Sequence, residues 1–285
     1  MMKTKFLWWL LPLALLLACT DDELPDVAAK TVEPSDDPLD IYIRENFLDP
    51  YGVSVRYRFV DRYVDPANRV TPPRQELVQP ALEFLLEYWI APYLEIANGD
   101  AYLESTIPAE VVLIGSFIFN FDGTVVLGTA DAGARITLTD INSVDDTDQT
   151  WVFRQLGTIY HEYAHIMHQR FDLPPNYQEV SPQGYTSPGS WFTLSDAEAL
   201  RRGFVSPYAT SSANEDFAEL VAFLLYEPDF FGTYINDEDC TDDDCQARNA
   251  GRAMIRTKYS AILEHYERNT GVDLLQLRAR IQDRL

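Results

Sequence analysis

Basic residues are scarce in this chain of 285 residues, which has 22 Lys and Arg against 45 Asp and Glu. The formal net charge is -23, and a surface this acidic repels the phosphates of nucleic acids and of anionic lipid headgroups. The sequence also shows neither a glycine-rich phosphate loop nor the signature of a serine nucleophile. We therefore expect no nucleic-acid partner and no chemistry that depends on either motif.

Apolar runs long enough to span a bilayer are also missing. The N-terminal run Phe6–Leu17 is too short for that, and the two lysines before it are typical of a signal peptide. It ends in Leu16-Leu17-Ala18-Cys19, which resembles a bacterial lipobox. This resemblance implies that residues 1–18 are removed and that lipid on Cys19 holds the mature protein to a membrane. An ordinary cleaved signal or a membrane anchor is the alternative.

Residues 19–37 have few apolar side chains to bury and are rich in Pro, Asp and Glu, which predicts an acidic flexible tether. The acidic residues directly after Cys19 resemble the export tag of lipoproteins that reach the outer face of the outer membrane. The resemblance implies an outer-membrane lipoprotein exposed at the cell surface, with the periplasmic face as the alternative.

Cysteine is rare too, with three residues in the whole chain. Cys240 and Cys245 lie close together in an acidic segment, and outside the cytoplasm such a pair predicts a disulfide that closes a small loop. A second metal site is the alternative, but the segment lacks a second Cys or His pair at ligand spacing.

The remaining residues, 38–285, are enough for one sizeable core. Alternation, helical spacing and Pro or Gly breakers predict strands first and helices afterwards, which indicates a single α+β domain. The expected helices are 38–47, 72–97, 149–170, 213–226, 247–269 and 273–285. The expected strands are 53–59, 111–121 (as one strand or two), 124–127 and 134–141. Residues 128–133 are expected to form a loop, before a strand that could pair with an extended substrate.

The expected helix 149–170 contains His161-Glu162-Tyr163-Ala164-His165 in a chain with four histidines. Residues i and i+4 share one face of a helix, so His161 and His165 can direct two imidazoles at one ion. Zinc suits imidazole and keeps an open coordination position. Glu162 can then accept a proton from a water on that ion. The alternative is a helix whose His and Glu only pack or face solvent.

A third ligand is needed, and the expected helix 213–226 offers Glu215 and Glu219 on one face. One of them can bind the metal while the other fixes the orientation of a ligand histidine. Glu215 also completes a capping box with Ser212, which explains it as helix chemistry alone. His168 lies about two turns beyond His161, so we expect it to support the site rather than to bind the same ion.

The spacing of His161, His165 and Glu215 resembles the gluzincin pattern, HExxH followed at a distance by Glu. Residues 208–219 resemble the corresponding stretch of the anthrax lethal factor group of peptidases. The resemblance implies that Glu215 is the third ligand of one zinc ion per chain. It also implies that Tyr208 lines the site and meets the charge that develops on a substrate carbonyl. Glu219 would orient a ligand.

Most of the mature chain resembles a family of bacterial zinc-binding metallopeptidase lipoproteins, also described as substrate-import-associated zinc metallohydrolases. The matching parts are the lipobox, Tyr51–Tyr57, His161–Gln169, Gly203–Tyr208 and the helix that bears Glu215. The resemblance implies a zincin-like fold, with a mixed sheet, an active-site helix and a helical C-terminal part. It also implies a role beside an outer-membrane nutrient importer and its substrate-binding lipoprotein.

The sequence thus predicts a zinc metallohydrolase that cleaves peptides with a metal-activated water. One alternative is a surface substrate-binding lipoprotein of an import complex that retains the fold. Another is a zinc amidase or esterase that acts on a non-peptide substrate. The aromatic residues Tyr185, Trp191, Phe192 and Phe204 lie between the two metal-binding helices, and they either wall a cleft or pack beneath a loop.

Overall fold

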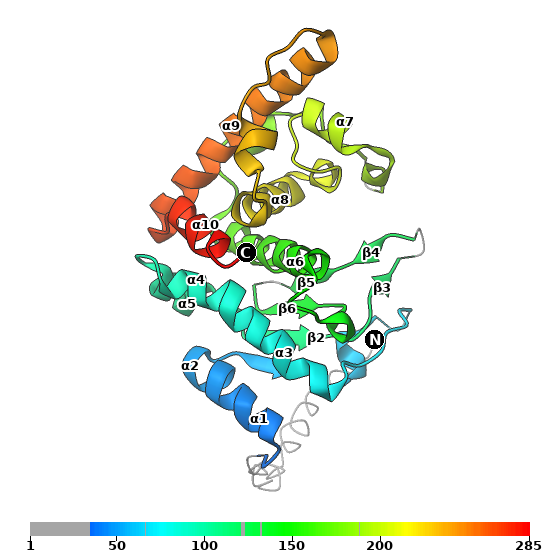
Figure 1. Ribbon diagram of the computed structural model, residues 1–285, viewed down its shortest axis with the longest axis vertical. Helices are drawn as coiled ribbons and strands as arrows, with labels where there is room; N and C mark the ends of the chain where they lie inside the picture. Colours follow the sequence, from blue (N-terminus) through cyan, green and yellow to red (C-terminus); the bar gives the residue numbers. More distant parts are fainter. Residues whose placement is uncertain (1–34, 66, 121–122, 132, 188) are drawn as a thin grey trace, which may run out of the picture. The chain divides into compact units, whose positions relative to one another are not determined.

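The computed structural model describes residues 35–65, 67–120, 123–131, 133–187 and 189–285 (Figure 1). Residues 37–285 form one compact unit. The lipobox with Cys19 and nearly all of the expected tether lie outside the described residues. Among the helices of the described ranges, none combines the length and the apolar character needed to cross a membrane.

The main sheet has four strands in the order β1-β2-β6-β5. Its strands are β1 (Ser54–Arg56), β2 (Glu110–Leu113), β6 (Arg135–Leu138) and β5 (Gly128–Asp131). The first three run parallel, and β5 pairs antiparallel with β6 at the edge. A separate hairpin pairs β3 (Ile118–Phe119) with β4 (Val125–Val126). Strands and helices therefore form the α+β fold that the sequence predicts.

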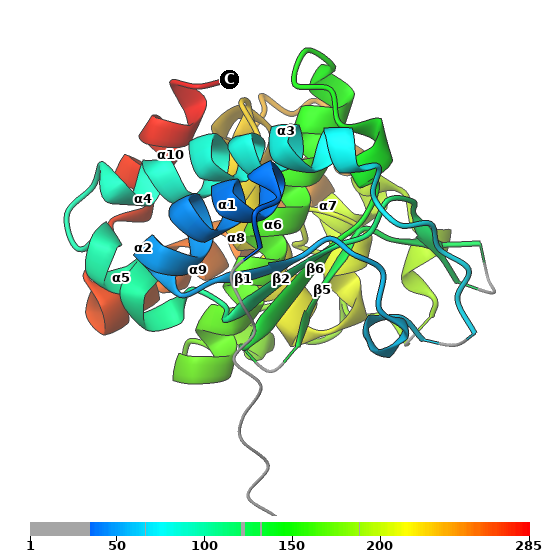
Figure 2. The same cartoon turned by 90° about the horizontal axis from the view of Figure 1, so that it is seen from below.

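The two faces of the sheet pack against different parts of the chain. Successive strand residues point to opposite faces, so Val111 and Leu113 enter the main core while Val112 joins a smaller cluster with Ile114 and Ile118. Figure 2 shows helices α1 (Pro38–Ile43), α3 (Gln75–Leu85) and α6 (Gln149–Phe171) on one side of the sheet. Helix α6 is therefore held directly against the strands.

The long helix expected at 72–97 begins at Gln75 and ends at Leu94, as α3, a π-helical turn (Leu86–Ile90) and α4 (Ala91–Leu94). Pro92 has no N–H to donate to the carbonyl of Tyr88, one turn earlier. That carbonyl instead accepts a hydrogen bond from the hydroxyl of Tyr160 on α6. The proline thus frees a backbone acceptor that ties this helix to α6.

The helix expected at 38–47 is also confirmed, and it continues to Tyr51 through a π-helical turn (Arg44–Leu48) and α2 (Asp49–Tyr51).

The C-terminal half is helical, with α7 (Asp196–Arg201), α8 (Ala213–Tyr226), α9 (Asp243–Thr270) and α10 (Leu274–Gln282). Figure 1 shows α6 between the sheet and α8. The expected helices 149–170 and 213–226 are confirmed, with one extra residue at the end of α6. Helix α9 begins earlier than expected because Asp242 caps it by accepting the N–H of Cys245. At this helix start, Cys240 and Cys245 form a disulfide with their Cα atoms 5.3 Å apart.

The expectation of a loop at 128–133 is wrong, because residues 128–131 form the edge strand β5. Its residues lack an apolar alternation, and the strand forms where β6 offers it a pairing partner. The expected strand 53–59 shortens to β1. Helices α5 (Gly99–Thr106) and α7 were not predicted, since neither shows a clear apolar period at its short length.

Candidate metal centre

Helix α6 carries the two histidines into the interior. Its first turn is capped by Asp148, whose carboxylate accepts the N–H of Thr150 at 2.9 Å. Apolar residues around the rest of the helix are buried and fix its rotation. His161 and His165 lie one turn apart on the side facing α8, with their Nε2 atoms 3.0 Å apart. Two ring nitrogens are thus directed at one point.

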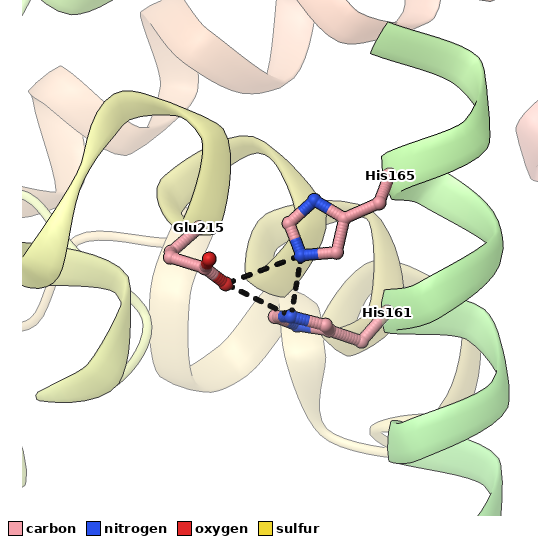
Figure 3. A group of neighbouring side chains, drawn as sticks. All are labelled: His161, His165 and Glu215. Carbon is pink, nitrogen blue, oxygen red and sulfur yellow. Dashed lines mark hydrogen bonds and ion pairs between the residues drawn. The ribbon is translucent and has the colours of Figure 1, made fainter. Parts of the chain in front are cut away.

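Helix α8 brings a carboxylate to the same point. The Glu215 Oε2 atom lies 3.0 Å from the Nε2 of His161 and 3.2 Å from that of His165 (Figure 3). All three ligand atoms lie within 4.8 Å of one another. Ser212 caps α8 by accepting the N–H of Glu215, so the cap and the metal-facing carboxylate coexist in one residue. Two imidazoles and one carboxylate are the protein ligands of one class of catalytic zinc site.

The outer nitrogen of each histidine is also engaged. His161 Nδ1 lies 2.8 Å from Glu219 Oε1, and His165 Nδ1 lies 2.8 Å from the Nε2 atom of His168. These contacts leave both Nε2 atoms directed toward Glu215, as a metal would require. The hydroxyl of Ser206 donates to the other oxygen of Glu219. Ser206 cannot be recognised from the sequence, since a lone serine in a loop gives no signal.

The centre favours positive charge. Burial lowers the pKa of His161, but the hydrogen bonds with Glu215 and Glu219 outweigh that effect and raise it to about 10. Burial raises the pKa of Glu215, and its hydrogen bonds with the two histidines lower it far below its ordinary value. Burial and the neighbouring His165 lower the pKa of His168 to about 4, so its imidazole is neutral at physiological pH. The residues thus fit a divalent cation at this point.

Glu162 and Tyr208 lie beside the three ligands. Glu162 is 7% exposed, and its burial raises the pKa of the carboxyl against the pull of His161 and His165. The Tyr208 ring lies 5.8 Å from the ring of His161 and packs edge-on against Trp191. Burial, followed by the charges of nearby glutamates, raises the pKa of the Tyr208 phenol, which therefore keeps its proton. A proton acceptor and a proton donor thus face one cleft.

The cleft passes on both sides of the ligands. A hollow of about 330 Å³ is lined by β5, both ligand histidines and Glu215. A second hollow of about 560 Å³ shares Gly128, His161, Glu162 and Tyr208 with the first. Its further walls include the apolar side chains of Val125, Val126, Phe153, Trp191, Phe223 and Tyr226. The site therefore offers room for a chain that continues past the metal position, with an apolar compartment on one side.

The structure gathers seven of the predicted site residues in this cleft or directly behind it: His161, Glu162, His165, His168, Tyr208, Glu215 and Glu219. Of the aromatic residues between the two metal-binding helices, some lie in the cleft and others in the interior. Trp191 lines the cleft, whereas Phe204 is buried and packs against Tyr185 with ring centres 4.9 Å apart. Both interpretations of this stretch therefore hold, each for different residues.

Comparison with known proteins extends over most of the chain. No protein with a curated description matches it. A crystal structure of a "putative zinc-binding metallo-peptidase" from Bacteroides caccae ATCC 43185 is similar at 28% sequence identity and a TM-score of 0.68, over 86% of this chain and 90% of that one. A family model described as "Putative zinc-binding metallo-peptidase" matches residues 32–275. The chain therefore belongs to this family of zinc-binding metallopeptidases.

Proposed function

We propose that the protein is a zinc-dependent peptidase of the gluzincin type with a zincin-like fold. The convergence of His161 Nε2, His165 Nε2 and Glu215 Oε2 carries the proposal, because these atoms meet from two helices at a cleft. One zinc ion per chain would be held there. When bound, it supplies a Lewis acid that polarises a carbonyl and activates a water.

The surrounding side chains divide the remaining work. Glu162 accepts the proton of the attacking water and passes it to the leaving amine, as its place in the cleft next to the ligands allows. The neutral phenol of Tyr208 donates a hydrogen bond to the carbonyl oxygen as negative charge develops there. Glu219 and His168 hold the ligand imidazoles in orientation through their Nδ1 atoms.

An extended peptide suits this cleft better than a compact substrate. Strand β5 pairs with β6 on one side, and its residues 128–130 line the cleft. The backbone of an edge strand can pair with a substrate strand and hold it across the metal position. The apolar compartment beside Glu162 can then take a large apolar side chain next to the bond that is cleaved.

The test compares the protein with its Glu162→Gln variant on peptide libraries, with zinc content measured in both. Glutamine keeps the size of the side chain but cannot accept the proton, so the rate should fall at least about 10²-fold while zinc stays bound. A chelator should abolish the activity of the unaltered protein. Normal hydrolysis by Glu162→Gln would contradict the mechanism. A zinc-loaded protein that binds peptides without cleaving any would favour a capture function instead.

We also propose that the protein is a lipoprotein of the outer membrane, exposed at the cell surface and associated with a nutrient importer and its substrate-binding lipoprotein. Support comes from the lipobox that ends at Cys19 and from the acidic residues after it. A tagged fatty acid should label the protein, and Cys19→Ser should abolish the label. An unlipidated periplasmic protein, or one that never crosslinks to an importer, would reject the corresponding part of the proposal.

A further inference from the structure

A buried ion pair lies directly behind the metal centre. The Nζ atom of Lys258 on α9 lies 2.7 Å from Oδ2 of Asp216 on α8, and the two side chains are 0% and 1% exposed. Burying two charges is unfavourable unless their geometry and hydrogen bonds compensate for the lost hydration. Asp216 also accepts the hydroxyl of Tyr185 at 2.9 Å. The pair is therefore well satisfied, and the peptidase mechanism described above does not use it.

Lys258 makes a second bond, to a different part of the site. Its Nζ atom donates to the carbonyl oxygen of Gly203 at 2.9 Å and lies 3.8 Å from the centre of the Phe204 ring. Gly203 and Phe204 begin the segment that leads to Ser206 and Tyr208. One ammonium group thus joins α9 both to the first turn of α8 and to this segment.

Close packing leaves the segment little freedom against α9. Gly203 has φ +86°, and a Cβ atom there would lie 2.7 Å from the Cβ of Met254. A Cβ on Gly251 would lie 1.7 Å from the carbonyl oxygen of Leu200. Gly251, Met254 and Lys258 follow one another at helical spacing along one face of α9. The backbone of residues 200–204 therefore packs closely against this face of α9.

Both ends of the Lys258 contacts lead to metal-site residues. Asp216 follows Glu215 in the first turn of α8, so a shift of Asp216 would move the ligand carboxylate. Ser206, after Gly203, holds Glu219, and Glu219 holds His161. Tyr208 follows in the same segment. Lys258 thus adds a second link between the first turn of α8 and the segment, beside the direct bond from Ser206 to Glu219.

We propose that Lys258 is a positioning residue of the metal centre, which sets Glu215 and the Ser206–Tyr208 segment relative to the histidines of α6. It acts through Asp216 and the Gly203 carbonyl and touches neither metal nor substrate. The proposal rests on the proposed function, in that zinc is taken as the bound ion. Loss of a group that orients metal ligands typically weakens metal affinity about 10–100-fold.

The experiment measures two quantities in the full chain, zinc Kd by chelator competition and the free energy of unfolding without metal. Lys258→Met should weaken zinc binding about 10-fold or more. The matched control is Arg252→Met on the same helix, because Arg252 is also buried and paired, with Glu238 and the Thr233 carbonyl. This control should lose stability and keep its zinc Kd. If Lys258 has only a structural role, Lys258→Met should also lose stability and keep its zinc Kd, as Arg252→Met does.

A double variant, Lys258→Met with Asp216→Leu, keeps the proposal testable if the single variant does not fold. Apolar replacement of a whole buried ion pair is often neutral for stability. We expect the double variant to fold and still to bind zinc weakly, because the bond to the Gly203 carbonyl is gone. Zinc affinity equal to that of the unaltered protein in the folded Lys258 variants would overturn the positioning role alone. Absence of zinc binding in the unaltered protein would overturn the proposed function and this proposal together.

Discussion

Each ligand histidine uses its two ring nitrogens differently. In His161 and His165 the Nε2 atoms face Glu215, while the Nδ1 atoms contact Glu219 and His168. By its residue type alone, His168 could be a fourth metal ligand. Its place behind His165, rather than beside it, instead makes it an orienting neighbour.

This geometry predicts different consequences for two substitutions. Among the described residues, Glu215 is the one carboxylate in the cluster with His161 and His165. Glu215→Ala removes it, so most bound zinc should be lost. His168→Ala removes an orienting contact and should keep one zinc per chain, with affinity weakened about 10–100-fold at most. Metal content after gel filtration measures both. Full zinc occupancy in Glu215→Ala would remove Glu215 from the ligand set.

Tyr208 is expected to act only during the reaction. Tyr208→Phe keeps the ring against Trp191 but removes the donor to the carbonyl oxygen. Its kcat should fall by roughly 10²-fold with little change in KM or zinc content. Tyr63→Phe serves as the control, since Tyr63 bonds to Glu110 beside the sheet. A near-normal kcat in Tyr208→Phe, at unchanged stability, would show that Tyr208 only packs.

Among the elements, β5 and α6 define the width of the cleft. Gly128 allows their close approach, because a Cβ there would lie 2.6 Å from Thr158 and 3.2 Å from the Glu162 side chain. Gly157, the residue before Thr158 on α6, forms part of the apolar compartment, and a Cβ there would lie 3.3 Å from the Tyr226 ring. Glycine at positions 128 and 157 thus leaves room in the cleft beside the metal ligands and in the apolar compartment.

Filling the apolar compartment should therefore change specificity. Gly157→Leu places a branched side chain against Tyr226 and reduces the room for a large substrate side chain. The kcat/KM for substrates with Phe or Leu next to the cleaved bond should fall roughly 10-fold or more, as pocket changes of 1–3 kcal/mol produce. Substrates with Gly or Ala there act as the internal control and should change little. An equal loss for all substrates would mean that the compartment does not bind this side chain.

In the whole molecule, the metal centre joins the sheet-bound helix α6 to the C-terminal helices through α8. Because the three ligands come together only in the folded chain, zinc binds the native state in preference to the unfolded one. Ligand binding of this kind stabilises the native state by about 2.7 kcal/mol at a zinc concentration 100 times Kd.

Zinc should accordingly raise the Tm of the unaltered protein in thermal unfolding, and a chelator should reverse the rise. Glu215→Ala should show little of this shift, since its ligand set is incomplete. A zinc-induced rise of the same size in Glu215→Ala would place the stabilising ion elsewhere in the chain.

Local signals explain what could be predicted from the sequence. The spacing of His161 and His165 places them on one helix face, and the serine cap at Ser212 with Pro228 beyond the helix marks α8 correctly at both ends. The pairing of Cys240 with Cys245 follows from their nearness in the chain. Such features depend on contacts within a few residues, which periodicity and spacing describe.

Tertiary structure decided the rest, because it depends on neighbours that are distant in the chain. Strand β5 exists because β6 has an edge to pair with, although its own residues carry no strand pattern. The bond from Ser206 to Glu219 and the ion pair of Lys258 with Asp216 join residues from different elements. No local pattern shows which serine or lysine is buried behind a metal centre. Packing of α8 against α9 and against the segment that carries Ser206 brings these groups close enough to bond.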